Sequence, residues 1–194
     1  MIYTSSHDNF KLRNQRTVSI SGNRGKDAGY VGECYPALAP KLSFWKIWHN
    51  NIGIIPEEEN NKYYIEEYYK QVLSKLNIDK VYNDLDGAVL LCYENYDEFC
   101  HRHIVAAWFE LVLDRLTPEI IINSKITDVV EAPLYIKEYL EEVMINDLDM
   151  KGFNSLHALY LYNKGMKLEE KGKELQRMAC VNDFEYVKKF VKKK

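Results

Sequence analysis

The chain has 194 residues, 46% of them hydrophobic, which is enough to bury one main core. Acidic and basic residues nearly balance at a net charge of -3, so no global positive field attracts nucleic acid or an anionic membrane. Four cysteines are too few for a disulfide framework, and neither a signal peptide nor a membrane-spanning run is evident. We therefore expect a cytoplasmic protein with reduced thiols and no membrane association.

Two short runs near the amino terminus have the composition of β-strands. Residues 1–6 and 17–21 are rich in β-branched and small polar residues, and a turn follows at 22–25. Residues 29–42 carry two glycines and two prolines, which predicts an ordered loop with at most a short helix.

Three further elements are expected in the middle of the chain. Residues 60–76 place aromatic and aliphatic side chains at helical spacing, which predicts an amphipathic helix. Ala88–Cys92 is a short, uninterrupted apolar run, as in a central strand that is covered on both faces. A helix over 98–116 should follow, with Asp97 as its N-cap and Pro118 after its end.

This order of elements predicts an α/β fold over residues 1–118, with a Rossmann-like, mostly parallel sheet flanked by helices. Residues 119–194 show helical patterns only, with helices expected over 134–145, over 156–180 and at the lysine-rich end. We therefore expect a C-terminal all-helical extension over 119–194.

Reactive side chains gather around the end of the third predicted strand. In a parallel sheet, ligands bind at the carboxyl ends of the strands. That edge should bring Cys92 and Glu94 together on one side, while Cys100 lies in the first turn of the next helix, where the helix dipole favours a thiolate. Arg102 adds a planar fork of donors that suits an anion.

The same segment resembles the family known as domain of unknown function 488. The resemblance covers roughly residues 1–118 and rests on Leu90-Leu91-Cys92-Tyr93-Glu94, Phe99-Cys100-His101-Arg102-His103 and Val105-Ala106-Ala107-Trp108. It extends weakly to Ile2-Tyr3-Thr4-Ser5, Ser19-Ile20-Ser21-Gly22 and Leu38-Ala39-Pro40. It implies an α/β fold and a site at Cys92, Glu94, Cys100, His101 and Arg102, but no particular reaction.

The first functional interpretation is an enzyme in which Cys100 is the nucleophile and Glu94 moves a proton, with His101 and Cys92 also in the catalytic site. Nine residues separate Cys92 from Arg102, which is too many for the loop of a tyrosine phosphatase.

A second interpretation uses the phosphate-binding character of the turn after the second strand. Ser21, Arg24 and Arg102 would hold an anionic small molecule or a nucleotide while an aromatic ring stacks on its base. The turn has no glycine-rich nucleotide-binding pattern, and the net charge gives nucleic acid no support.

A third interpretation makes the cluster a structural or metal-binding element of a non-catalytic nucleic-acid- or protein-binding module. Cys92, Cys100, Glu94 and one of His101 and His103 are suitable zinc ligands, but their spacing matches no standard zinc motif, so we assign no metal site and no cofactor.

Plain packing is the competing explanation for these residues. Buried free cysteines are common, and the tyrosine-rich helix and the tryptophans most simply fill the core. His7, His49 and His157 are isolated in the sequence and receive no role. The polar groups that accompany the two cysteines still favour a functional site, because such groups need partners at the end of an apolar strand.

Overall fold

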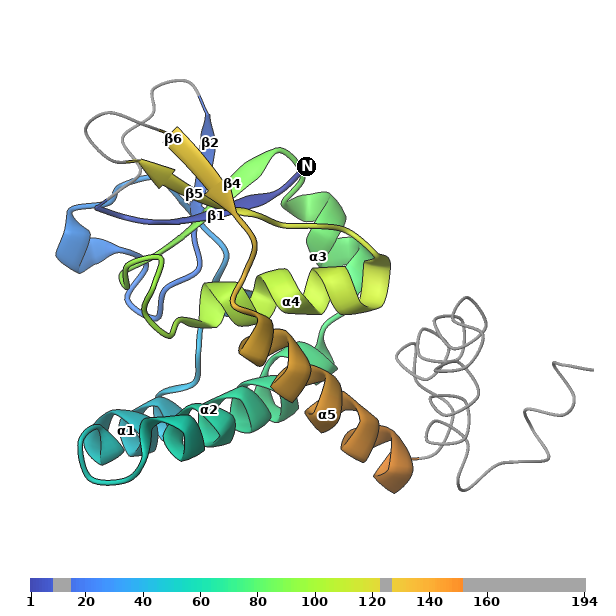
Figure 1. The fold of residues 1–194 in the computed structure, drawn as a ribbon. Helices are drawn as coiled ribbons and strands as arrows, with labels where there is room; N and C mark the ends of the chain where they lie inside the picture. The colour runs from blue at the N-terminus through green and yellow to red at the C-terminus, as the bar shows by residue number, and fades with distance from the viewer. Residues whose placement is uncertain (9–14, 123–126, 152–194) are drawn as a thin grey trace, which may run out of the picture. The chain divides into compact units, whose positions relative to one another are not determined.

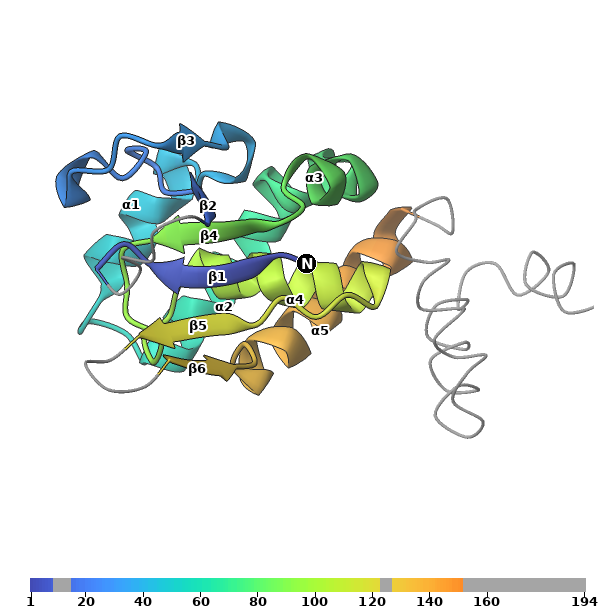
Figure 2. The ribbon, with the colours of Figure 1, turned by 90° about the horizontal axis from the view of Figure 1, so that it is seen from above.

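A computed structural model describes residues 1–8, 15–122 and 127–151 of the chain. Its six strands are β1 (Tyr3–Ser6), β2 (Arg16–Ser19), β3 (Glu33–Cys34), β4 (Ala88–Cys92), β5 (Glu119–Ile122) and β6 (Thr127–Val130). They form one sheet in the order β3-β2-β4-β1-β5-β6. The pairs from β3 to β5 are parallel, and β6 is antiparallel to β5. The protein therefore has a mixed α/β fold with a mostly parallel sheet (Figure 2).

The helices are α1 (Leu42–Asn51), α2 (Glu57–Gln71), α3 (Ile78–Asp84), α4 (His101–Leu113) and α5 (Leu134–Lys151). Short 3-10 helices lie at Lys26–Ala28, Pro36–Leu38 and Leu73–Lys75. Helix α4 packs against β1 and β4 on one side and contacts α2 and α3, and α1 packs on α2 (Figure 1). This double covering explains why Trp108 and its neighbours in α4 are buried around most of the helix.

Strand β4 lies at the centre of the sheet, where the sequence placed it. Gly87 precedes it with a φ of 73°, a conformation that glycine adopts without strain. All five residues of β4 are buried. Its side chains alternate between the two faces of the sheet, so Val89 and Leu91 pack with Ile120 while Cys92 faces α4. The strand thus delivers Cys92 to the helix-covered face.

The sequence analysis missed one helix and misplaced the start of another. Helix α1 occupies Leu42–Asn51, most of which had no predicted element. Helix α4 begins at His101 rather than at residue 98, and its N-cap is Cys100 rather than Asp97. Cys100 therefore immediately precedes the first turn of α4 and has an extended backbone, with φ -148° and ψ 144°.

The prediction that only helices follow Pro118 was also wrong. Strands β5 and β6 continue the sheet over 119–130, with Glu119 beside Thr4 of β1. Glu119–Ile122 contains three isoleucines and is apolar like β4. Such a short run forms a strand only beside a strand that can pair with it, and here β5 pairs with β1. Helix α5 follows Pro133 as expected, while the helices expected beyond 151 lie outside the described residues.

The chain divides into two compact units, Met1–Leu140 and Glu141–Lys194. The whole sheet and helices α1 to α4 belong to the first unit, and the candidate site described below lies entirely within it. Among the described residues, no helix combines the length and apolar character needed to cross a lipid bilayer.

Candidate functional site

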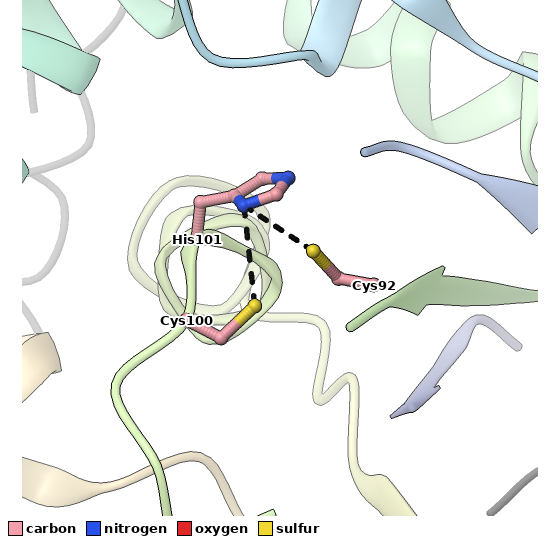
Figure 3. A group of neighbouring side chains, drawn as sticks. All are labelled: Cys92, Cys100 and His101. Carbon is pink, nitrogen blue, oxygen red and sulfur yellow. Dashed lines mark hydrogen bonds between the residues drawn. The ribbon is translucent and has the colours of Figure 1, made fainter. Parts of the chain in front are cut away.

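Two cysteines and a histidine meet where β4 points at the start of α4. Cys92 ends the strand, Cys100 caps the helix and His101 is its first residue. The Nδ1 atom of His101 lies 3.6 Å from Cys92 Sγ and 3.9 Å from Cys100 Sγ (Figure 3). All three side chains are 95% or more buried. Residues separated along the chain by a loop thus form one compact cluster.

The orientation of the His101 ring is fixed by a backbone group. Its Nε2 atom lies 3.0 Å from the carbonyl oxygen of Ile20, just beyond β2. Because a carbonyl oxygen only accepts hydrogen bonds, Nε2 must be the donor and carry a hydrogen. The other ring nitrogen, Nδ1, is therefore directed at the two sulfur atoms. This arrangement leaves Nδ1 able to bind or release a proton next to the thiols.

Glu94 lies beside Cys100, as the sequence analysis expected. The Cys100 thiol donates a hydrogen bond to Oε2 of Glu94 at 2.8 Å. Burial of the carboxyl group and the nearby charge of Cys100 raise the pKa of Glu94 to about 7. A carboxyl group with such a pKa exchanges protons near neutrality, which is the property that a general acid or base needs.

The two cysteines differ in their ionisation. Burial raises the pKa of Cys92 well above its ordinary value, so its thiol stays neutral. Burial also opposes ionisation of Cys100, but a hydrogen bond with Cys92 and the positive charges of Arg102 and His101 hold its pKa well below the ordinary value. Burial likewise opposes protonation of His101, but the charge of Cys100 raises the pKa of the ring. Cys100 is thus the thiol that is poised to ionise.

A cavity of about 460 Å³ opens next to this cluster. Cys92, Glu94, Cys100 and His101 contribute to its lining. The remaining lining residues are mostly aromatic or small: Ser21, Gly22, Asn23, Asp27, Pro40, Leu42, Trp45, Trp48, Tyr64, Tyr93 and Phe99. The volume lies in the usual range for small-molecule sites. The catalytic residues predicted from the sequence therefore share a cavity large enough for a ligand.

The residues predicted to bind an anion are distributed differently. Ser21 lines the cavity, and its hydroxyl lies 2.9 Å from that of Ser19. Arg24 is exposed and has a φ of 64°, within the turn that follows β2. Neither Arg24 nor Arg102 is among the described residues that line the cavity. Of the three predicted anion-binding residues, only Ser21 therefore reaches it.

Arg102 forms a buried ion pair instead. Its Nε atom donates to both carboxylate oxygens of Glu119 at 3.1 Å, and its Nη2 atom donates to the carbonyl of Asn95 at 2.8 Å. Thr4 also donates to Glu119, at 2.5 Å, and His103 Nε2 lies 3.5 Å from the same carboxylate. The guanidinium thus anchors the loop before α4 through Asn95, and its positive charge lowers the pKa of Cys100.

Three residues of the site were missed by the sequence analysis. Glu119 lay in the segment expected to be helical, and its partners are distant in sequence, so no local signal identified it. Asp27 gave no signal because it lies in a 3-10 helix of only three residues, which is too short to show a sequence periodicity. His7 lies 3.4 Å from the Ser19 hydroxyl, which contacts Ser21, so it is connected to the cavity wall through two serines. Only the meeting of strand ends at one edge could have suggested this connection.

The cluster also has the donor atoms of a metal site. The sulfur atoms of Cys92 and Cys100 and the Nδ1 atom of His101 all lie within 4.8 Å of one another. Sulfur and imidazole nitrogen suit zinc, and a histidine ligand commonly donates its second N–H to a carbonyl, as His101 does to Ile20. His103 is directed to Glu119, so only one of the two neighbouring histidines joins the cluster.

Comparison with known proteins supports the resemblance noted from the sequence. No curated protein matches the chain, and no solved structure does. Residues 2–112 match the family DUF488-N3a, described as "Active DUF488-N3 subclade", and this range contains the cavity and its cluster. Because the match spans more than half of the chain, the protein belongs to the DUF488 family.

Proposed function

We propose that the protein is an enzyme in which the Cys100 thiolate attacks an electrophilic atom of a small molecule of nucleoside or nucleotide size. The bond from that atom to its leaving group breaks as the bond to sulfur forms, and the leaving group takes the proton of His101 Nδ1. A water molecule that gives a proton to Glu94 then displaces the sulfur and restores the thiolate. One observation carries the proposal: Cys100 Sγ lies beside His101 Nδ1 and 2.8 Å from Glu94 Oε2, at the wall of a ligand-sized cavity. A nucleophile within reach of groups that move protons is the usual arrangement of thiol catalysis.

Each neighbour of Cys100 has a defined role in this proposal. Protonated His101 stabilises the thiolate and supplies a proton at Nδ1, while its Nε2–H remains bonded to Ile20. Glu94, with a pKa of about 7, accepts or donates a proton at the substrate. The neutral thiol of Cys92 donates a hydrogen bond that favours the Cys100 thiolate. The word "Active" in the description of the matching family agrees with catalysis.

Alkylation by iodoacetamide, followed by mass spectrometry of the labelled peptides, tests the proposal. Cys34 is a matched internal control, since it is partly exposed and its sulfur contacts the backbone carbonyls of Arg24 and Gly32 at 3.6 to 3.7 Å. We expect Cys100 to react about tenfold faster than Cys34 at pH 7, because a lower pKa increases the thiolate fraction. Equal or slower labelling of Cys100 in the folded protein would remove the basis for a nucleophilic role.

A metal site is the second candidate function, and the spacing of the cluster favours it. Zinc bonds of ordinary length to sulfur and nitrogen place the two ligand atoms about 3.6 Å apart in a tetrahedron. The separations of 3.6 and 3.9 Å between Nδ1 and the two sulfurs are close to this value. Such a site would leave a fourth position for a ligand or for Glu94.

Metal analysis of the purified protein separates the two candidates. Stoichiometric zinc that disappears in the Cys92→Ser variant would support the metal site and exclude a free Cys100 nucleophile. Metal-free protein that takes up no zinc during dialysis, combined with fast alkylation of Cys100, would support the thiol enzyme. The Cys34→Ser variant controls for adventitious binding by an accessible thiol.

A further inference from the structure

Aromatic side chains form part of the cavity wall. Trp45 and Trp48 from α1, Tyr64 from α2 and Phe99 before α4 contribute to its lining. Trp48, Tyr64 and Phe99 pack against one another with centroid separations of 5.2 to 5.8 Å. Since rings that are locked by neighbours lose little freedom when a ligand binds, this wall favours an aromatic ligand.

The charges around the cavity have one predominant sign. Asp27 and Glu94 contribute carboxyl groups to the lining, and no lysine or arginine is among the lining residues that the structure describes. A phosphate or carboxylate placed in this cavity would therefore meet carboxyl groups without a balancing cation, which is unfavourable in a partly buried space.

The cation nearest to the cluster is already neutralised. Arg102 is fully buried and holds Glu119 through both carboxylate oxygens. Turning its guanidinium toward the cavity would leave Glu119 buried with the weaker contacts of Thr4 and His103, at a large energetic cost. Arg102 thus lowers the pKa of the Cys100 thiol from outside the cavity lining and does not compensate the charge of a ligand.

From this combination we propose that the ligand of the cavity is a planar heterocycle with no negative charge, and that a positively charged ring binds best. Cations bind to the faces of aromatic rings, and a carboxylate such as Asp27 strengthens this attraction. The inference rests on the proposed function of the same cavity and adds the charge and shape of its substrate. An N-alkylated nucleobase has the required size, planarity and charge.

Three adenine compounds test the charge preference at nearly constant ring shape: 1-methyladenosine as the cation, adenosine as the neutral form and adenosine 5'-monophosphate as the anion. Binding is measured by tryptophan fluorescence in the full chain carrying Cys100→Ser, so that the result does not depend on the reactivity of the thiol. We expect 1-methyladenosine to bind at least tenfold more tightly than the monophosphate, with adenosine between them. Equal binding, tighter binding of the monophosphate, or no binding of any of the three would overturn the proposal.

A charge-removing variant locates the effect in the cavity. Asp27→Asn should weaken binding of 1-methyladenosine about fivefold and leave adenosine nearly unchanged, because only the cation interacts with the lost charge. Asp79→Asn removes an exposed carboxylate that does not line the cavity and should change neither value. Equal losses for the two compounds in Asp27→Asn would indicate a structural effect and contradict the proposed electrostatic contact.

Failure of this inference can be distinguished from failure of the proposed function. Fast alkylation of Cys100 together with preferential binding of the monophosphate would retain the thiol enzyme and overturn the charge preference. Slow alkylation together with preferential binding of 1-methyladenosine would retain the ligand class and overturn the nucleophile.

Discussion

The guanidinium of Arg102 and the carboxylate of Glu119 form an ion pair with 0% and 2% of their side chains exposed. One partner lies in the first turn of the helix beside the candidate nucleophile, and the other belongs to strand β5. The hydrogen bond of Thr4 to Glu119 adds β1 to this connection. The pair therefore links the sheet to the loop and helix that carry the candidate site.

Removing the charge of Glu119 should destabilise the protein strongly. We expect Glu119→Gln to lower the free energy of unfolding by about 3 kcal/mol, because Arg102 would remain buried without its counter-ion. Urea denaturation followed by circular dichroism measures the change. Glu33→Gln, which breaks the exposed pair with Arg16, should cost less than about 1 kcal/mol and is the control. Similar decreases in the free energy of unfolding in both variants would show that the buried ion pair contributes no more to stability than the exposed one.

Arg102 should also influence the reactivity of Cys100 without contacting a substrate. Its positive charge helps to lower the pKa of the Cys100 thiol, and the conservative exchange Arg102→Lys would retain that charge. We expect Arg102→Gln to slow alkylation of Cys100 at pH 7 by about tenfold and Arg102→Lys to slow it much less. Near-ultraviolet circular dichroism of both variants confirms that they are folded. Equal rates in the two variants would show that the charge of Arg102 does not control the thiol.

The reactivity of Cys100 should depend on pH through Glu94. The pKa of Glu94 is about 7, because burial and the neighbouring Cys100 oppose its ionisation. Below this pH, Glu94 and Cys100 share one proton, and this hydrogen bond reduces the nucleophilicity of the sulfur. Above this pH the shared proton is lost and the thiolate is more nucleophilic. The alkylation rate should therefore rise as the pH passes through about 7.

The Glu94→Gln variant provides the control for this pH dependence. An amide carries no negative charge to oppose the thiolate, so the rise in rate should move to lower pH. Rates measured with iodoacetamide on both sides of neutrality make the comparison. An unchanged profile in the variant would contradict the proposed sharing of a proton between Glu94 and Cys100.

Cys92 should assist Cys100 without reacting itself. Burial raises the pKa of Cys92, and its hydrogen bond lowers the pKa of Cys100. We expect Cys92→Ala to shift the alkylation profile of Cys100 to higher pH, while Cys34→Ala leaves it unchanged. Peptide mapping should show little labelling of Cys92 in the folded protein. Labelling of Cys92 before Cys100 would reverse the assigned roles.

The local sequence determined the elements whose signals are short-range. The apolar run Ala88–Cys92 forms β4 with the predicted bounds, since a central strand must be apolar on both faces. The motif residues Cys92, Glu94, Cys100 and His101 supported the family resemblance, which the family match confirms. They line one cavity because the strand end and the helix start are only a short loop apart.

Tertiary structure alone decided the partners of the charged residues and the later part of the sheet. Arg102 looked like a ligand-binding residue until β5 placed Glu119 beside it, 17 positions along the chain. The short run at Glu119–Ile122 became a strand because the edge of β1 offered backbone partners. Burial and strand pairing depend on residues that are remote in sequence. A local sequence pattern therefore cannot specify which remote residue will pair with a given side chain or strand.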